Sequence, residues 1–174
     1  MTQTTQLKVL SLKQPWATLI AIGAKKIETR SWPTKHRGPL LIHASASWDK
    51  AGRELFKHPV CNDILLMEGF GEMDLIPLGK IVGFAQVNDC KPIRELKGDV
   101  DPRYQDFPPM PELLFGGYGL GRSAWILDER VYGKFNNPPA FKGKLGFANI
   151  EVTYKMLWAD WRANDHDLIA PWFS

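Results

Sequence analysis

The sequence contains little cysteine and no long apolar segment. Two cysteines, Cys61 and Cys90, are too few for a disulfide framework, so we expect a reduced, cytoplasmic setting. The N-terminus has no basic region followed by an apolar stretch, so we expect no signal peptide. Every apolar run is far shorter than the ~20 residues that cross a bilayer, so no membrane partner is expected.

Metal-binding and phosphate-binding patterns are also missing. The four histidines show no metal-ligand spacing with each other or with either cysteine, so we expect no metal site and no cofactor. The glycine-rich run at 116–121 lacks the lysine and the helix of a phosphate-binding loop, and is interpreted as a rim beside a cleft. His43 lies in an apolar strand, where a hydrogen-bonded core histidine is more common than a catalyst.

Composition and length indicate one globular domain. The 174 residues are 44% hydrophobic and 24% charged, which are ordinary values for such a domain. The net charge of +3 is unevenly distributed: residues 1–53 carry +7, residues 54–78 carry −4, and residues 79–174 are neutral. A basic first third is a plausible footprint for a polyanion, although an ordinary solvated surface has the same composition.

Apolar periodicity and turn residues predict a small mixed α+β barrel of five to six strands flanked by helices. A helix is expected over 14–24, with Pro15 in its first turn and Gly23 as its C-terminal cap. Residues 46–78 are expected to be helical and irregular, and 92–120 to form a long connection. Strands are expected at 7–12, 26–32, 38–45, 79–88 (with a bulge or close backbone approach at Gly83), 123–127 and about 147–152.

The strand expected at 26–32 carries the most informative side chains. Alternation along a strand places Lys26, Glu28, Arg30 and Trp32 on one face, and Ile27 and Thr29 on the other. Hydrogen-bonding charge beside a flat indole suits a nucleobase or nucleotide better than it suits a core.

These residues belong to a longer pattern. Leu10-Ser-Leu-Lys-Gln-Pro-Trp-Ala17 is followed by Gly23-x-Lys25-x-x-Glu28-x-Arg30, and this combination resembles the activating signal cointegrator homology (ASCH) domain family. The resemblance continues through further segments, covering about 10–46, 79–91 and 121–150. It implies a barrel related to PUA RNA-binding domains. Residues 1–152 would form this single domain with insertions at 47–78 and 92–120, and 153–174 would be an extension that packs on it.

The resemblance further implies a cleft beside the first helix that holds RNA or a nucleotide. Some small family members are amidohydrolases that act on N4-acetylcytidine, with a threonine nucleophile three residues after the lysine. Glu28 occupies that position here, which counts against the same mechanism. Other members are reported as ribonucleases, so a metal-independent hydrolase in which Lys25 stabilises an anion and Glu28 acts as base stays an alternative.

The predicted ligand site combines charged and aromatic side chains. Lys25 and Arg30 would bind phosphate, Glu28 would accept from a base amino group, and Trp32 would stack on a base. The alternatives are a structural Glu28–Arg30 ion pair and, for Trp16, packing in the core. The complete predicted set is Gln14, Trp16, Lys25, Glu28, Arg30, Trp32, Arg37 and Gly38.

A third hypothesis places a protein partner on the C-terminal segment. Trp158 and Trp161 would share one face if that segment were helical, forming a hydrophobic lid or a partner surface. RNA or nucleotide binding ranks first, hydrolysis second and protein interaction third.

Overall fold

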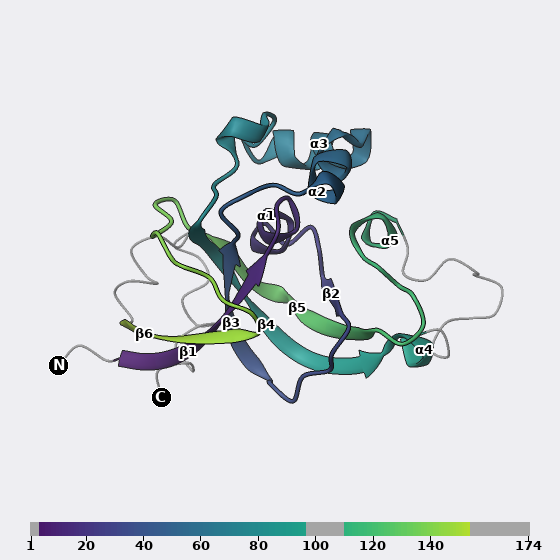
Figure 1. Ribbon diagram of the computed structural model, residues 1–174, viewed down its shortest axis with the longest axis vertical. Coiled ribbons are helices and arrows are strands. Elements are labelled where there is room, and N and C mark those ends of the chain that lie inside the picture. Colours follow the sequence, from purple (N-terminus) through teal and green to yellow (C-terminus); the bar gives the residue numbers. More distant parts are fainter. Residues whose placement is uncertain (1–3, 97–109, 154–174) are drawn as a thin grey trace.

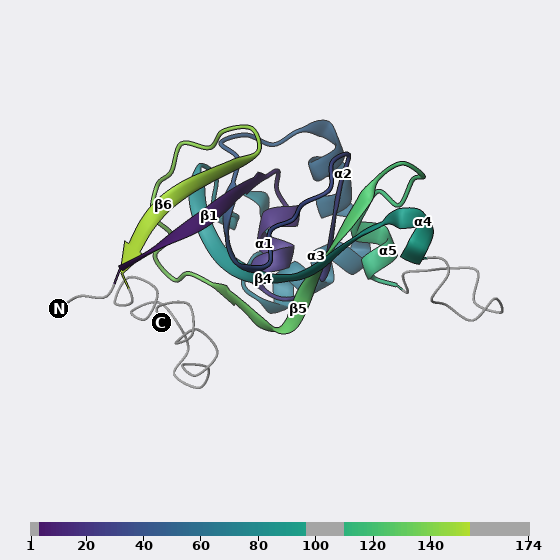
Figure 2. The ribbon, with the colours of Figure 1, turned by 90° about the horizontal axis from the view of Figure 1, so that it is seen from below.

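The computed structural model describes residues 4–96 and 110–153. Its strands form one strongly curved sheet, and a short helix lies inside the curve (Figures 1 and 2). The predicted 153–174 extension and its tryptophans lie outside the described residues, apart from Thr153.

The sheet has six strands in the order β2-β5-β4-β3-β1-β6. Only the β1–β3 pair is parallel, and the other four pairs are antiparallel. The α+β class and the mixed, six-stranded sheet are therefore as predicted. The barrel is open, because β2 and β6 are the two edges of the sheet and do not pair with each other in the described chain. The strands are β1 (Thr4–Leu12), β2 (Ile27–Arg30), β3 (Gly38–Ala44), β4 (Lys80–Pro92), β5 (Ser123–Lys134) and β6 (Phe147–Thr153).

The helices are short, and most of them lie in the two regions predicted to be irregular or to form a long connection, 46–78 and 92–120. The expected helix over 14–24 is confirmed as the shorter α1, and Gly23 adopts φ +75° just after its end. Within the described residues the helices are α1 (Trp16–Ala21), α2 (Lys50–Lys57), α3 (Pro59–Met67), the 3₁₀ turn η1 (Met73–Leu75), α4 (Ile93–Leu96) and α5 (Glu112–Phe115).

β4 and β5 are longer than the apolar pattern predicts. The polar run beginning at Asp128 ends the apolar alternation, yet β5 continues to Lys134, with the Asp128 carboxylate accepting from the N–H groups of Arg130 and Val131. The pairing register shifts along this part of the sheet. Gly83 provides the expected close approach, since a Cβ there would lie 2.0 Å from the carbonyl oxygen of Gly133.

The main core lies between α1 and the concave face of the sheet. Trp125 of β5 is fully buried there, with Ile20 of α1 and Ile42 of β3 in the same cluster. Cys61 and Cys90 are both free, as expected. Among the described residues no helix is long and apolar enough to cross a membrane.

Candidate functional site

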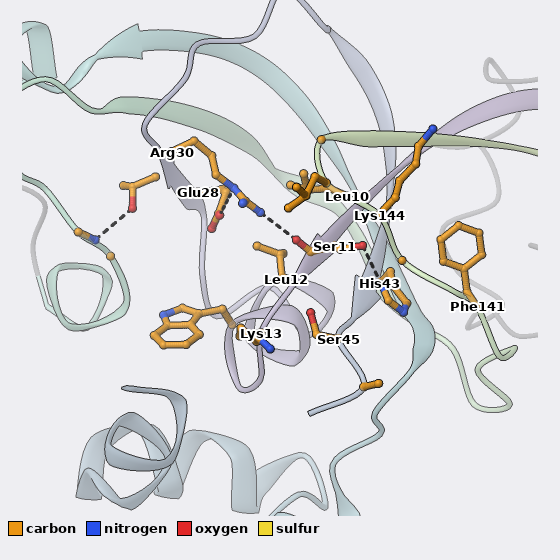
Figure 3. Close-up of a pocket in the computed structure, with 18 of the residues that line it drawn as sticks. Leu10, Ser11, Leu12, Lys13, Glu28, Arg30, His43, Ser45, Phe141 and Lys144 are labelled. Atoms are coloured by element: carbon orange, nitrogen blue, oxygen red, sulfur yellow. Dashed lines mark hydrogen bonds and ion pairs between the residues drawn. The ribbon is translucent and has the colours of Figure 1, made fainter. Parts of the chain in front are cut away.

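A cavity of about 1090 Å³ opens where β1, β2 and β3 meet α5 and the 141–146 loop. The close-up in Figure 3 shows side chains from these separate elements around it. Residues far apart in the sequence therefore share one hollow, including Trp16, Glu28, His43 and Phe141.

The lining of this cavity is strongly positive. Its five cations are opposed, within the described chain, by the single carboxylate of Glu28. A concave surface with an excess of one charge sign concentrates counter-ions of the other sign. The cavity therefore favours an anionic occupant. The cations are Lys13, Arg30, Arg122, Lys142 and Lys144.

A chain of polar contacts crosses the cavity wall (Figure 3). Arg30 Nε lies 2.8 Å from Glu28 Oε1, and Arg30 Nη2 donates to the carbonyl oxygen of Ser11 at 3.0 Å. The Ser11 hydroxyl in turn lies 2.8 Å from His43 Nδ1. These contacts fix the Arg30 guanidinium in one orientation at the cavity, while its side chain stays partly exposed.

His43 is buried and hydrogen-bonded, as predicted, and also lines the cavity. Burial lowers the pKa of its imidazole, with a smaller opposing effect from the Phe141 backbone. Its ring meets Phe141 edge-on at 5.2 Å between centroids. Nε2 is buried without a well-formed hydrogen bond in the described part of the molecule.

Gly143 covers the Ser11–His43 pair. A Cβ at this position would lie 2.5 Å from both Ser11 Oγ and His43 Cε1, so only glycine fits without a shift. The flanking Lys142 and Lys144 are exposed, and neither makes an ion pair or hydrogen bond within the described chain. Two lysines without an ion-pair or hydrogen-bond partner in the described chain therefore border the cavity.

Lys25 does not line the cavity. It is only 2% exposed, donates to the carbonyl oxygen of Ile27, and lies 3.8 Å from Glu28 Oε2 and 3.6 Å from Glu112 Oε1. The cause is the early end of α1, after which the N–H of Lys25 bonds to the Leu19 carbonyl. This turn directs the ammonium inward.

Glu112 is a buried charged residue that the sequence analysis did not include in the predicted site. Its carboxylate accepts from the N–H groups of Lys26 (2.7 Å) and Ile27 (3.1 Å) and from the Tyr118 hydroxyl (3.2 Å). Burial, followed by the nearby Glu112 charge, raises the pKa of Tyr118. Together with Lys25, Glu112 joins α5, which forms one cavity wall, to β2.

Trp16 and Thr29 contribute to the same wall. The indole N–H of Trp16 donates to the Phe115 carbonyl at 2.8 Å, so this side chain both packs against α5 and lines the cavity. Thr29 also lines it, although alternation placed it opposite Glu28, and its hydroxyl accepts from the N–H of Gly117 at 3.0 Å. The glycine-rich run thus borders the cavity, as the rim interpretation predicts.

Three other predicted ligand residues have internal partners and do not line the cavity. Gln14 is buried and donates to the Pro77 carbonyl at 2.8 Å. The ring of Trp32 packs 4.7 Å from that of Trp125, in the core side of the sheet. Arg37 pairs with an Asp89 oxygen at 2.8 Å.

Gly38, the last predicted ligand residue, begins β3 with φ +105° and is also absent from the cavity lining. Lys26, expected on the Glu28 face, pairs with Glu129 at 3.8 Å. The structure therefore brings Trp16, Glu28 and Arg30 together at the cavity and leaves the other five predicted residues outside it.

The sequence-family model of the ASCH domain matches residues 10–106 of the chain. The chain belongs to the ASCH domain family. Activating signal cointegrator 1 from Homo sapiens is 33% identical over 88 residues, which are 51% of this chain and 15% of that protein. The Mus musculus protein of the same name is 56% identical over 36 residues, 21% of this chain and 6% of that protein. The chain thus matches a small part of these relatives.

Solved ASCH structures from Zymomonas mobilis are more distant. One has a TM-score of 0.45 at 15% identity and covers 92% of this chain and 90% of that chain. A mutant form of that protein has a TM-score of 0.44 at 15% identity, with coverage of 92% and 93%. At this distance no residue role can be transferred to the ASCH domain described here.

Four cavity cations were missed by the prediction from sequence: Lys13, Arg122, Lys142 and Lys144. The signal for the last two was present, because Lys-Gly-Lys is a small turn with unbalanced charge inside a segment counted as neutral overall. Arg122 had no comparable signal. Among the described residues no group of three His, Cys, Asp or Glu side chains could hold a metal ion.

Proposed function

We propose that this ASCH domain binds RNA or a nucleotide in the cation-lined cavity. The observation that carries the proposal is that five Lys and Arg residues and one carboxylate residue line a hollow of about 1090 Å³. Binding pockets for small ligands commonly measure ~300–1000 Å³, so this cavity is large enough for a ligand such as a nucleotide.

The chemistry of the wall fits such a ligand. Lys142 and Lys144 have no ion-pair or hydrogen-bond partner among the described residues and are available to phosphate oxygens. Arg30 is already oriented by Glu28 and Ser11, so less side-chain entropy is lost when its remaining donors bind an anion. Trp16 offers a flat surface at the same cavity, and stacking of one base on an aromatic ring contributes about 1–3 kcal/mol.

The two alternatives have less support. In the hydrolase hypothesis Lys25 stabilises a developing anion, but its ammonium is enclosed by Glu28, Glu112 and the Ile27 carbonyl. The protein-interaction hypothesis concerns residues 153–174, nearly all of which lie outside the described part of the chain.

The test is fluorescence anisotropy with labelled single-stranded RNA over a range of salt concentrations. We expect affinity to fall as salt rises, because phosphate contacts release counter-ions. The double variant Lys142→Ala/Lys144→Ala should bind more weakly, and its salt slope should be smaller by about 0.7 for each lost phosphate contact on a single strand.

Lys57→Ala is the matched control, since Lys57 is an exposed lysine at the end of α2 that does not line the cavity. Competition with mononucleotides would separate a nucleotide site from an RNA site. Equal affinity and equal salt slope for the wild type and the double variant would remove the cavity from RNA binding.

A further inference from the structure

The 141–146 loop between β5 and β6 has a fixed base. The N–H of Phe141 donates to the Gly79 carbonyl at 3.0 Å, and the Phe141 ring packs against His43. Gly143 lies against the Ser11–His43 pair, and β6 begins at Phe147, whose ring is 5.6 Å from that of Trp32. Both ends and the middle of the loop are therefore held by the body of the domain.

The tip of the same loop is fully in solvent. Leu145 is 99% exposed, more than any other large hydrophobic residue in the described chain. It lies directly after Lys144, and both residues line the cation-rich cavity. The loop thus has an anchored base and presents a leucine and two lysines at the cavity, so it can contact a ligand that combines an apolar face with negative charge.

We propose that Leu145 is an apolar wedge that stacks on the last base pair of a nucleic acid where a duplex meets a single strand. The unpaired strand enters the cavity, and Lys142 and Lys144 contact phosphates on either side of the junction. This inference rests on the function proposed above and specifies the form of the nucleic acid.

The physical argument concerns which nucleic-acid surfaces are apolar. Phosphates and sugars cover a continuous duplex, and the flat faces of its base pairs are exposed only at an end, a junction or an opened step. Leucine is among the side chains that proteins insert at such steps. Leu145 beside two lysines matches a base-pair face bordered by phosphates.

An anionic membrane surface also attracts an apolar residue flanked by lysines. It matches the rest of the site less well, because lipid headgroups on a flat surface would leave the cavity empty. A nucleic acid with an unpaired strand fills the cavity and gives Glu28 base amino groups as donors.

The experiment uses the full chain and three labelled RNAs: a single strand, a blunt duplex, and a duplex with a single-stranded overhang. The overhang RNA carries 2-aminopurine at its last paired position, so unstacking there raises fluorescence. We expect the wild type to bind the overhang RNA more tightly than the blunt duplex. Leu145→Ser should weaken overhang binding at least fivefold and abolish the fluorescence rise, with single-strand affinity unchanged within twofold.

Met67→Ser is the matched control, because Met67 is 87% exposed at the end of α3 and does not line the cavity. Neither substitution replaces a buried side chain, so both variants should fold. The wedge is supported if only Leu145→Ser weakens overhang binding and loses the fluorescence rise.

Three results would overturn it, each in a recognisable way. If the wild type binds none of the RNAs, the proposed function fails and the wedge fails with it. If the wild type binds but Leu145→Ser behaves identically on all three RNAs, RNA binding stands and the wedge is wrong. If the wild type shows no overhang preference and instead binds phosphatidylserine vesicles in a Leu145-dependent manner, the loop contacts lipid.

Discussion

The Ser11 hydroxyl lies 2.8 Å from Nδ1 of the buried His43, and this pair joins β1 to β3 at the wall of the cavity. The two strands are parallel neighbours, and Ser11 and His43 are direct partners in their register. The hydrogen bond therefore reinforces the one parallel pairing in the sheet at the point where the binding cavity begins.

Ser11→Ala should destabilise the domain by about 1–3 kcal/mol, because Nδ1 of a buried imidazole loses its partner. The measurement is urea denaturation of the variant and wild type. Ser45→Ala is the control, since Ser45 also lines the cavity but its hydroxyl makes no hydrogen bond among the described residues. Equal stability of the two variants would contradict a structural role for the Ser11–His43 bond.

Gly143→Ala should displace the 141–146 loop, because the new methyl group would overlap Ser11 Oγ and His43 Cε1. We expect RNA affinity to fall several-fold and the His43 ring resonances to shift in NMR spectra. Gly146→Ala is an instructive control: its φ of +69° strains alanine by about 1–2 kcal/mol, but nothing lies within 4 Å of its Cβ. Unchanged His43 resonances in Gly143→Ala would argue against the close packing.

Lys25→Met should destabilise the domain by roughly 3–5 kcal/mol, since it leaves the carboxylates of Glu28 and Glu112 without their shared buried cation. Adding Glu112→Gln should recover part of this loss by removing one uncompensated charge. Chemical denaturation of the single and double variants tests this. A Lys25→Met protein with normal stability and weakened RNA binding would instead support the ligand role predicted from the sequence.

The stability of the domain should rise between pH 5 and pH 7. Burial lowers the pKa values of His36 and His43 below the ordinary value of 6.5. The unfolded chain therefore binds protons at a pH where the folded chain does not, so the free energy of unfolding falls as pH drops below about 6.5. Asp89 and Asp128 have lowered carboxyl pKa values, so their protonation affects the free energy of unfolding only at pH values below this range.

Urea denaturation at several pH values measures this slope, and His43→Gln should make it shallower. The comparison concerns the slope, so a general loss of stability in the variant does not obscure the result. Stability that is flat or falls from pH 5 to pH 7 in the wild type would contradict the prediction.

The elements that sequence reasoning located correctly are those with strong local signals. Gly23 marks the end of the first helix because its left-handed conformation is cheap only for glycine. The strands at 7–12 and 38–45 carry apolar runs that are buried as expected. Local pattern was less informative for β5, because the polar residues from Asp128 onward lie beyond the strand expected at 123–127 but continue it.

The site was harder to predict because it depends on contacts between distant segments. The Lys25 ammonium points inward toward Glu112, which lies 87 residues later in the sequence. No local sequence pattern predicts this ion pair. The cavity also takes cations from Lys13, Arg122 and the 141–146 loop, which meet only once the sheet has curved. Glu28 and Arg30 line the cavity together because they lie in one strand and alternation relates them directly.

The outer edge of β2 has a consequence for how molecules of this protein behave at high concentration. Side chains occupy its outward backbone groups: Glu112 takes the N–H of Ile27, Lys25 the carbonyl of Ile27, and Arg122 the carbonyl of Thr29 at 2.8 Å. An uncovered edge strand recruits strands from neighbouring molecules and seeds aggregation. Here the three charged residues occupy the positions of a seventh strand, and the β2 edge of the open barrel is protected against edge-to-edge pairing.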